Sequence, residues 1–89
     1  PNNIVEAINY SVPIIASKSA GGTAEILGNG KYGTLFETEN YKQLAKKIDD
    51  FLEDPSKLQK KVLKGRKELI KFMFSNTTKK LERIINQLF

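Results

Sequence analysis

The opening part of the chain switches from a helical to a strand pattern of apolar positions. In residues 2–10 the apolar side chains recur at helical spacing, and asparagine at the start offers the short side-chain oxygen that caps a helix. Residues 12–16 form a near-continuous apolar run rich in β-branched side chains, which is typical of a strand covered on both faces in a parallel sheet. Pro13 lacks an amide hydrogen and therefore belongs at the beginning of this strand.

A glycine-containing loop follows the strand. Gly21 and Gly22 permit a tight turn into a short helix predicted at residues 23–27, and residues 32–36 predict a second strand. Helix, strand, loop, helix and strand in this order are typical of half of a nucleotide-binding α/β unit. Ligands of such units collect at the carboxyl ends of the parallel strands.

The rest of the chain has helical patterns. Residues 41–52 place their apolar side chains on one face and most of their charges elsewhere, which predicts an amphipathic helix. Pro55 can open a second helix, in which Gly65 is a weak point and apolar residues such as Leu58, Val62, Leu69, Ile70 and Met73 point inward. Residues 74–76 are expected to break that helix before a last one at residues 76–89.

The composition limits the possible chemistry. With 89 residues the chain is one small domain at most. It contains no cysteine and no histidine, which excludes a disulfide framework and removes the commonest general base and metal ligand. No apolar run approaches the roughly 20 residues that span a bilayer. These features predict a reducing, cytoplasmic setting.

Basic residues concentrate in the second half of the chain. Residues 1–37 hold two lysines and three glutamates, whereas residues 38–89 hold thirteen basic and seven acidic residues. Solvated helix faces account for this mixture, and no stacking platform predicts nucleic acid as a partner. A peripheral contact with the cytoplasmic face of an anionic membrane remains an alternative, because basic residues are dense in one segment of the chain. Its basic residues are Lys57, Lys60, Lys61, Lys64, Arg66, Lys67 and Lys71.

Glu6 has two interpretations. With Asn3 it has the spacing of a capping box, in which the carboxylate stabilises the helix start, and taken alone it fits that role better. In the other interpretation, the amides around Asn2 and Asn3 hold a diphosphate while the Glu6 carboxylate accepts from sugar hydroxyls. Lys18 and Glu25 lie nearby in the sequence, and ordinary surface and helix-start roles account for them.

The order and spacing of these segments resemble the carboxyl-terminal part of a retaining glycosyltransferase of the GT-B type, from the family called group 1 or family 4. The segments that carry the resemblance are PNNIVEA at 1–7, VPIIA at 12–16, GGTAEIL at 21–27, YGTLF at 32–36, the helix and Asp-Pro step at 44–55, and the Phe-Ser step at 74–75. The resemblance implies an α/β fold in which a Rossmann-like parallel sheet with short strands is followed by long C-terminal helices. Residues 1–89 would be part of its nucleotide-sugar donor domain, with residues 76–89 crossing towards an N-terminal acceptor domain outside this chain.

In that family two glutamates separated by seven residues contact the sugar nucleotide. Glu6 matches the second, which holds the ribose hydroxyls, and the first would fall upstream of Pro1. Backbone amides of the segment matching Pro1 to Asn3 approach the sugar and the distal phosphate. Pro1 has no ordinary amide hydrogen, so Asn2 and Asn3 are the expected donors, with Pro1 and Ile4 alongside. The resemblance implies no catalytic residue in this segment and no metal or cofactor.

The resemblance predicts a hexosyltransferase-type enzyme for the full-length protein, acting in polysaccharide or glycolipid biosynthesis. It would transfer a sugar with retention from a nucleotide sugar, a UDP-sugar rather than a GDP-sugar, to an acceptor. The chain would contribute to ribose and diphosphate binding and would be inactive alone. The alternative is a catalytically silent α/β interaction module whose basic helices dock a partner or an anionic membrane.

Overall fold

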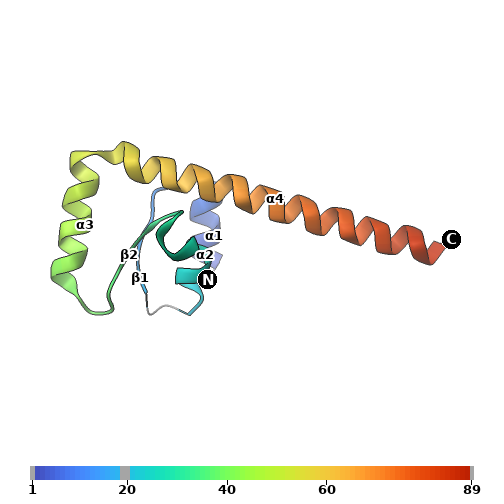
Figure 1. Cartoon of the computed structure of the whole chain (residues 1–89), viewed down its shortest axis with the longest axis horizontal. Helices are drawn as coiled ribbons and strands as arrows, with labels where there is room; N and C mark the ends of the chain where they lie inside the picture. Colours follow the sequence, from blue (N-terminus) through green and yellow to red (C-terminus); the bar gives the residue numbers. More distant parts are fainter. Residues whose placement is uncertain (1, 19–20, 89) are drawn as a thin grey trace.

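A computed structural model describes residues 2–18 and 21–88 of the chain, without the side chains of Asn2 and of residues 76–82, 84 and 88. Its elements in chain order are helix α1 (Asn2–Asn9), strand β1 (Ile15–Ser17), helix α2 (Thr23–Ile26), the 3₁₀ helix η1 (Gly28–Gly30), strand β2 (Thr34–Phe36), helix α3 (Tyr41–Glu53) and helix α4 (Pro55–Leu88). Figure 1 shows a small α/β body that lies against the first half of α4, whose second half projects beyond it. The molecule measures 59 × 25 × 17 Å.

The two described strands pair in parallel, as the α/β prediction requires. The register joins Ile15 to Thr34, Ala16 to Leu35 and Ser17 to Phe36. Both strands begin later in the chain than the sequence predicts, because backbone amides in front of each strand donate hydrogen bonds to carbonyls at the end of the preceding helix. The Val12 amide donates to the Ala7 carbonyl at 2.8 Å, and the Tyr32 amide donates to the Leu27 carbonyl at 3.0 Å.

One apolar core joins the body to the first half of α4. The buried apolar side chains of the described residues are Ile8, Ile14, Leu27, Leu58 and Val62. They come from α1, from the chain before β1, from the end of α2 and from α4. Because Leu58 and Val62 face inward as predicted, α4 serves as the cover of the α/β body.

Two side chains of α4 also bind the end of α1. The Arg66 Nε donates to the Asn9 carbonyl at 3.1 Å, and the Gln59 Nε2 donates to the Ser11 carbonyl at 3.3 Å. Carbonyls at the end of a helix have no partner within the helix, so these donors satisfy groups that would otherwise depend on water. The contacts set the direction in which α1 leads into β1.

The predicted break at residues 74–76 is wrong, because α4 continues without interruption to Leu88. Serine, asparagine and threonine cost only about 0.5 kcal/mol each inside a helix, and neither glycine nor proline follows them. The predicted separate helix at residues 76–89 is therefore the last part of α4, and Phe89 lies outside the described residues. The inward placement of Ile70 and Met73 is also wrong, because they are 48% and 57% exposed, whereas Leu69 packs against the core as predicted.

Asp54 links α3 to α4. Pro55 is the first residue of α4, as predicted, and the Asp54 carboxylate accepts from the Ser56 amide at 3.2 Å and from the Ser56 hydroxyl at 2.5 Å. The Ser56 hydroxyl is the main cause that lowers the pKa of Asp54 below its ordinary value, and the Ser56 amide and nearby Lys57 add to it. The carboxylate therefore acts as the cap of α4 in its ionised form.

We expect the Asp54 cap to be sensitive to acid. The pKa of the Asp54 carboxyl group is lower in the folded chain than in the unfolded chain, where it is about 4. The ionised carboxylate therefore stabilises the fold at pH values above about 4, and this stabilisation is lost as the pH falls through the folded pKa. Asp54→Asn keeps a capping side chain but does not titrate. Thermal unfolding followed by circular dichroism should show a Tm gap between the wild type and Asp54→Asn at pH 7 that shrinks at about pH 2.5. An equal gap at both pH values would contradict the assignment.

Candidate functional site

The amino end of α1 and the carboxyl ends of β1 and β2 lie on the same side of the molecule. In Figure 1 this is the lower side, where α1 begins and where β1 and β2 end. The arrangement follows from the chain: α1 runs antiparallel to the strand that it leads into, so the helix starts where the strand ends. The positive end of the α1 dipole therefore lies at the edge where α/β folds bind ligands.

The predicted site residues are all near the start of α1. Pro1 lies outside the described residues, and α1 begins at Asn2. The Ile4 side chain packs against the core, so only its amide faces the helix start, whereas Asn3 and Glu6 are exposed. By helix geometry the amides of the first turn have no partner within the helix. The structure thus brings these amides and the Glu6 carboxylate onto one short helix.

The predicted capping box is wrong. Because α1 begins at Asn2, Asn3 lies inside the helix, and the first turn of α1 holds no acidic residue. Glu6 is therefore one turn further along, where its carboxylate cannot cap the helix start. The spacing of Asn3 and Glu6 matches a capping box, but the spacing does not determine the residue at which the helix begins.

The loop after β1 is attached to β2. The Lys18 amide donates to the Phe36 carbonyl at 3.0 Å, and the Lys18 Nζ pairs with the Glu37 carboxylate at 2.6 Å. Lys18 thus joins the carboxyl ends of the two strands, in agreement with its expected surface role. Gly22 has φ 78° directly before α2, which confirms the predicted tight turn. Glu25 is exposed in the first turn of α2.

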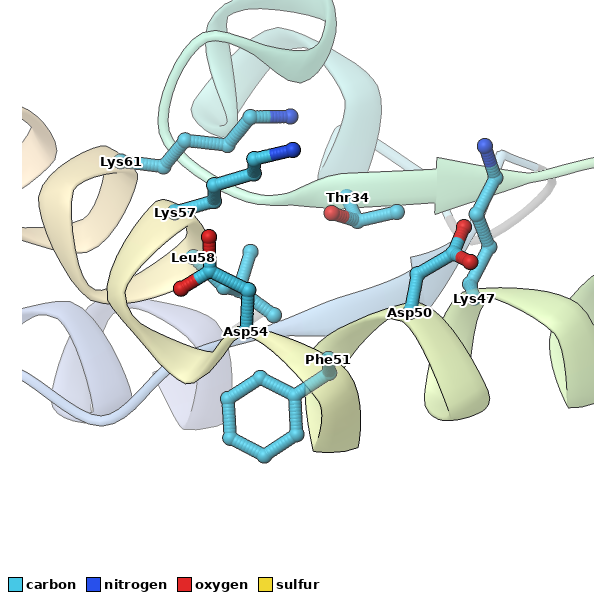
Figure 2. A pocket seen from close by; sticks show the side chains of 8 residues that line it. All are labelled: Thr34, Lys47, Asp50, Phe51, Asp54, Lys57, Leu58 and Lys61. Atoms are coloured by element: carbon cyan, nitrogen blue, oxygen red, sulfur yellow. The ribbon is translucent and has the colours of Figure 1, made fainter.

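A hollow lies between α3 and α4, and the sequence patterns did not point to it. Its lining residues are Thr34, Lys47, Asp50, Phe51, Asp54, Lys57, Leu58 and Lys61. Figure 2 shows Lys57 and Lys61 reaching it from α4 and Asp50 from α3. Its volume of about 210 Å³ is below the roughly 300 Å³ at which ligand pockets begin. Thr34 opens β2, so the hollow lies at the opposite end of the strands from the candidate site.

The described residues contain neither a metal-binding cluster nor a helix fit to span a membrane. No group of three or more acidic side chains is placed to hold a metal ion within residues 2–18 and 21–88. Over the same residues, none of the helices combines the length and apolar character that a membrane span needs.

Short parallel strands, a glycine turn and a helix that starts at the carboxyl edge together form a small α/β unit. The family of glycosyl transferases group 1 matches residues 1–69, which is most of the chain, and the chain belongs to this family. The resemblance carried by the segments at 1–7, 12–16 and 21–27 is confirmed.

One curated relative shares part of the chain. Over 48 residues the chain is 48% identical to a protein named probable sucrose-phosphate synthase from Thermosipho melanesiensis (strain DSM 12029 / CIP 104789 / BI429). The match covers 53% of this chain but 11% of the relative, so the chain spans a small part of that protein's length. No solved structure matches the chain.

Proposed function

We propose that the chain forms part of the donor site of a glycosyltransferase that moves a sugar from a nucleotide sugar to an acceptor with retention. The observation that carries the proposal is the start of α1 at the carboxyl edge of the β1–β2 sheet, in a chain of the group 1 family. In the proposed GT-B arrangement the described body is the end of a Rossmann-like donor domain. Residues 76–89 then cross towards an acceptor domain, and the protein is cytoplasmic.

The diphosphate is proposed to bind at the amides of Asn2, Asn3 and Ile4. Helix amino ends favour anions because the unpaired amides and the dipole both point at the ligand. Pro1 would lie alongside without donating. The amides would also stabilise the charge that develops on the leaving diphosphate, which is the type of stabilisation that contributes most to many transfer reactions.

Glu6 is proposed to accept hydrogen bonds from the ribose hydroxyls. Glu6 follows Asn3 by three residues, which corresponds to a rise of about 4.5 Å along the helix. The carboxylate repels the diphosphate but attracts hydroxyl donors, so the nucleotide binds with its ribose at Glu6 and its phosphates at the helix start. The exposure of Glu6 and its place beyond the first turn support this order, since capping does not occupy the carboxylate.

The chain is proposed to bind and orient the donor without catalysing transfer alone. It has no histidine or cysteine to act as base or nucleophile. Its part is the positioning of the donor and the stabilisation of the leaving group. The relative is named a sucrose-phosphate synthase, and on that ground we propose a hexosyl donor. We also propose that a UDP-sugar is preferred to a GDP-sugar.

Replacing Glu6 by alanine is expected to weaken UDP binding by about 10- to 100-fold, the range for hydrogen bonds to a charged group. The measurement is a titration with UDP, GDP and ADP followed by NMR of the backbone amides, with shifts centred on residues 2–6. Glu25→Ala, which removes another exposed helical glutamate, is the matched control and should leave binding unchanged.

A nucleotide without ribose hydroxyls separates the two roles of the site. Wild type and Glu6→Ala should bind 2′,3′-dideoxy-UDP equally, because this nucleotide has no ribose hydroxyl that could donate a hydrogen bond to the Glu6 carboxylate. An equal loss with UDP and the dideoxy nucleotide would overturn the ribose assignment. The donor-site proposal fails if amides 2–6 do not respond to millimolar nucleotide while the longer protein containing this chain is inert towards nucleotide sugars.

A further inference from the structure

A second hollow lies between α4 and the turn that leads from η1 to β2. Its volume of about 480 Å³ falls within the range of roughly 300–1,000 Å³ that is typical of ligand pockets. The turn contributes Lys31 and Tyr32 to its lining, and α4 contributes the rest. The α4 residues that line it are Lys61, Lys64, Lys67, Glu68 and Lys71.

The Tyr32 side chain fixes the distance between the two sides of this second hollow. A Cβ at Gly65 of α4 would lie 2.8 Å from the Tyr32 Cβ, and a Cβ at Gly28 would lie 2.8 Å from the Tyr32 Cε2. Tyr32 is therefore packed between these two glycines. The Lys31 amide donates to the Gly28 carbonyl at 3.3 Å, which holds the turn itself. The backbone that carries Lys31 is thus positioned against α4 by packing and backbone hydrogen bonds.

The charges around the two hollows differ. The first hollow, between α3 and α4, is lined by three lysines and two aspartates, a formal charge of +1. The second is lined by five lysines and one glutamate, a formal charge of +4. Both use α4 and share Lys61, so the difference comes largely from the segment opposite. There α3 supplies Asp50, whereas the turn before β2 supplies another lysine, Lys31.

The one carboxylate of the second hollow leaves most of this positive charge unbalanced. Glu68 pairs with Lys71 at 3.5 Å, and both side chains are more than half exposed. Within the part of the chain that the structure describes, the other four lysines of the hollow form no ion pair. Like charges around one concave surface repel each other and together attract anions, because the concave shape focuses their field.

We propose that the second hollow binds a small molecule that carries a short chain of phosphate groups. This chemistry is shared by inorganic polyphosphate and nucleoside triphosphates. A lysine ammonium group is a compact point charge with three donors, which suits phosphate oxygens approached from several directions. A phosphate chain brings several negative charges into one small volume, and five ammonium groups around one hollow match that concentration of charge.

The geometry favours a chain of phosphates over a single one. Lys61 and Lys71 are ten residues apart, which corresponds to about 15 Å along α4. A single phosphate reaches only part of this length, whereas linked phosphates can contact lysines from successive turns. Lys31 lies on the other side of the hollow, so the ligand would be held between two segments of the fold. Nucleic acid and bilayers bind exposed basic faces and need no such enclosure.

The second hollow is separate from the proposed donor site. Tyr32 precedes β2, so this hollow lies at the amino ends of the strands, whereas α1 begins at their carboxyl ends. The inference therefore goes beyond the proposed sugar transfer and does not depend on it.

The test is calorimetric titration of the chain with tripolyphosphate at about 50 mM NaCl, where exposed charges are only partly screened. Tripolyphosphate should bind at least about tenfold more tightly than orthophosphate, because more negative charges come within reach of the lysines. Amide shifts in NMR spectra should centre on residues 28–33 and 61–71 rather than on residues 2–6. ATP should shift the same amides: equal affinity assigns the site to the phosphate chain alone, and tighter affinity adds a contact with the nucleoside.

Lysine variants locate the binding site. Lys64→Gln with Lys67→Gln should weaken tripolyphosphate binding at least about tenfold. Lys42→Gln with Lys46→Gln, which removes the same charge from α3, should weaken it by no more than about twofold. Lys31→Gln should weaken it at least about threefold, although Lys31 does not belong to α4. Circular dichroism checks that each variant keeps its helix content, as expected for exposed lysines.

A carboxylate variant should change affinity in the opposite direction. Glu68→Gln removes the negative charge from the second hollow and should tighten tripolyphosphate binding about two- to fivefold. Glu53→Gln, which removes an exposed carboxylate from the end of α3, is the matched control and should leave binding unchanged.

Three results would overturn the proposal: equal losses for the α3 and α4 lysine pairs, no loss with Lys31→Gln, or amide shifts confined to residues 2–6. Duplex DNA or phosphatidylglycerol vesicles that bind through the same lysines and are not displaced by tripolyphosphate would also overturn it, in favour of a macromolecular partner.

Discussion

Replacing Leu27 by alanine is expected to lower the free energy of unfolding by about 2–5 kcal/mol. Leu27 is fully buried and packs with Ile8, Ile14 and Val62 in the core. A Cβ at Gly33 would lie 3.0 Å from the Leu27 Cδ2, so the backbone before β2 is packed directly on this side chain and cannot easily close the cavity. Domains of this size have total stabilities of about 5–15 kcal/mol, so the loss is a large fraction of the whole.

Urea unfolding followed by circular dichroism measures this loss. The matched control is Leu52→Ala, which removes the same atoms from a side chain that is 68% exposed on α3 and should change stability by no more than about 0.5 kcal/mol. The m-value should stay the same in both variants, since neither changes the surface exposed on unfolding by much. Equal losses in the two variants would show that α2 does not pack in the core.

Replacing Gly65 by alanine is expected to destabilise the chain by about 1–3 kcal/mol, although the same change stabilises an ordinary exposed helix by about 1 kcal/mol. A Cβ at Gly65 would lie 2.8 Å from the Tyr32 Cβ and 3.2 Å from the Tyr32 Cγ. It would also lie 3.6 Å from the Ile8 Cγ2. Gly65 is thus a point of close approach between α4 and the chain before β2, where an added side chain requires the Tyr32 side chain to move.

A double-mutant cycle with Tyr32→Gly tests the physical cause. With the Tyr32 side chain removed, Gly65→Ala should become neutral or stabilising, because only the gain in helix propensity remains. Thermal unfolding of the four proteins gives the coupling energy. A higher Tm for Gly65→Ala in the wild-type background would mean that α4 does not approach Tyr32 as closely as the structure shows.

The errors of the sequence interpretation have identifiable physical causes. Residues 74–76 have weak propensities against helix, and the backbone hydrogen bonds of a helix already formed outweigh them. Gly65 looked like a defect because its packing partner, Tyr32, is 33 residues away in the chain. The capping box at Asn3 and Glu6 failed because a match in spacing does not specify the first residue of a helix.

The sequence by itself determined the succession of α1, β1, α2, β2 and α3, the opening of α4 at Pro55 and the family of the chain, because these depend on local patterns and on motifs at defined spacing. It also indicated the amino end of the first helix as the candidate site, since a helix that leads into a parallel strand must begin at the carboxyl edge. Only the tertiary structure decided which segments of the body α4 packs against. That depends on contacts such as Arg66 with Asn9 and Gly65 with Tyr32, which join residues far apart in the chain.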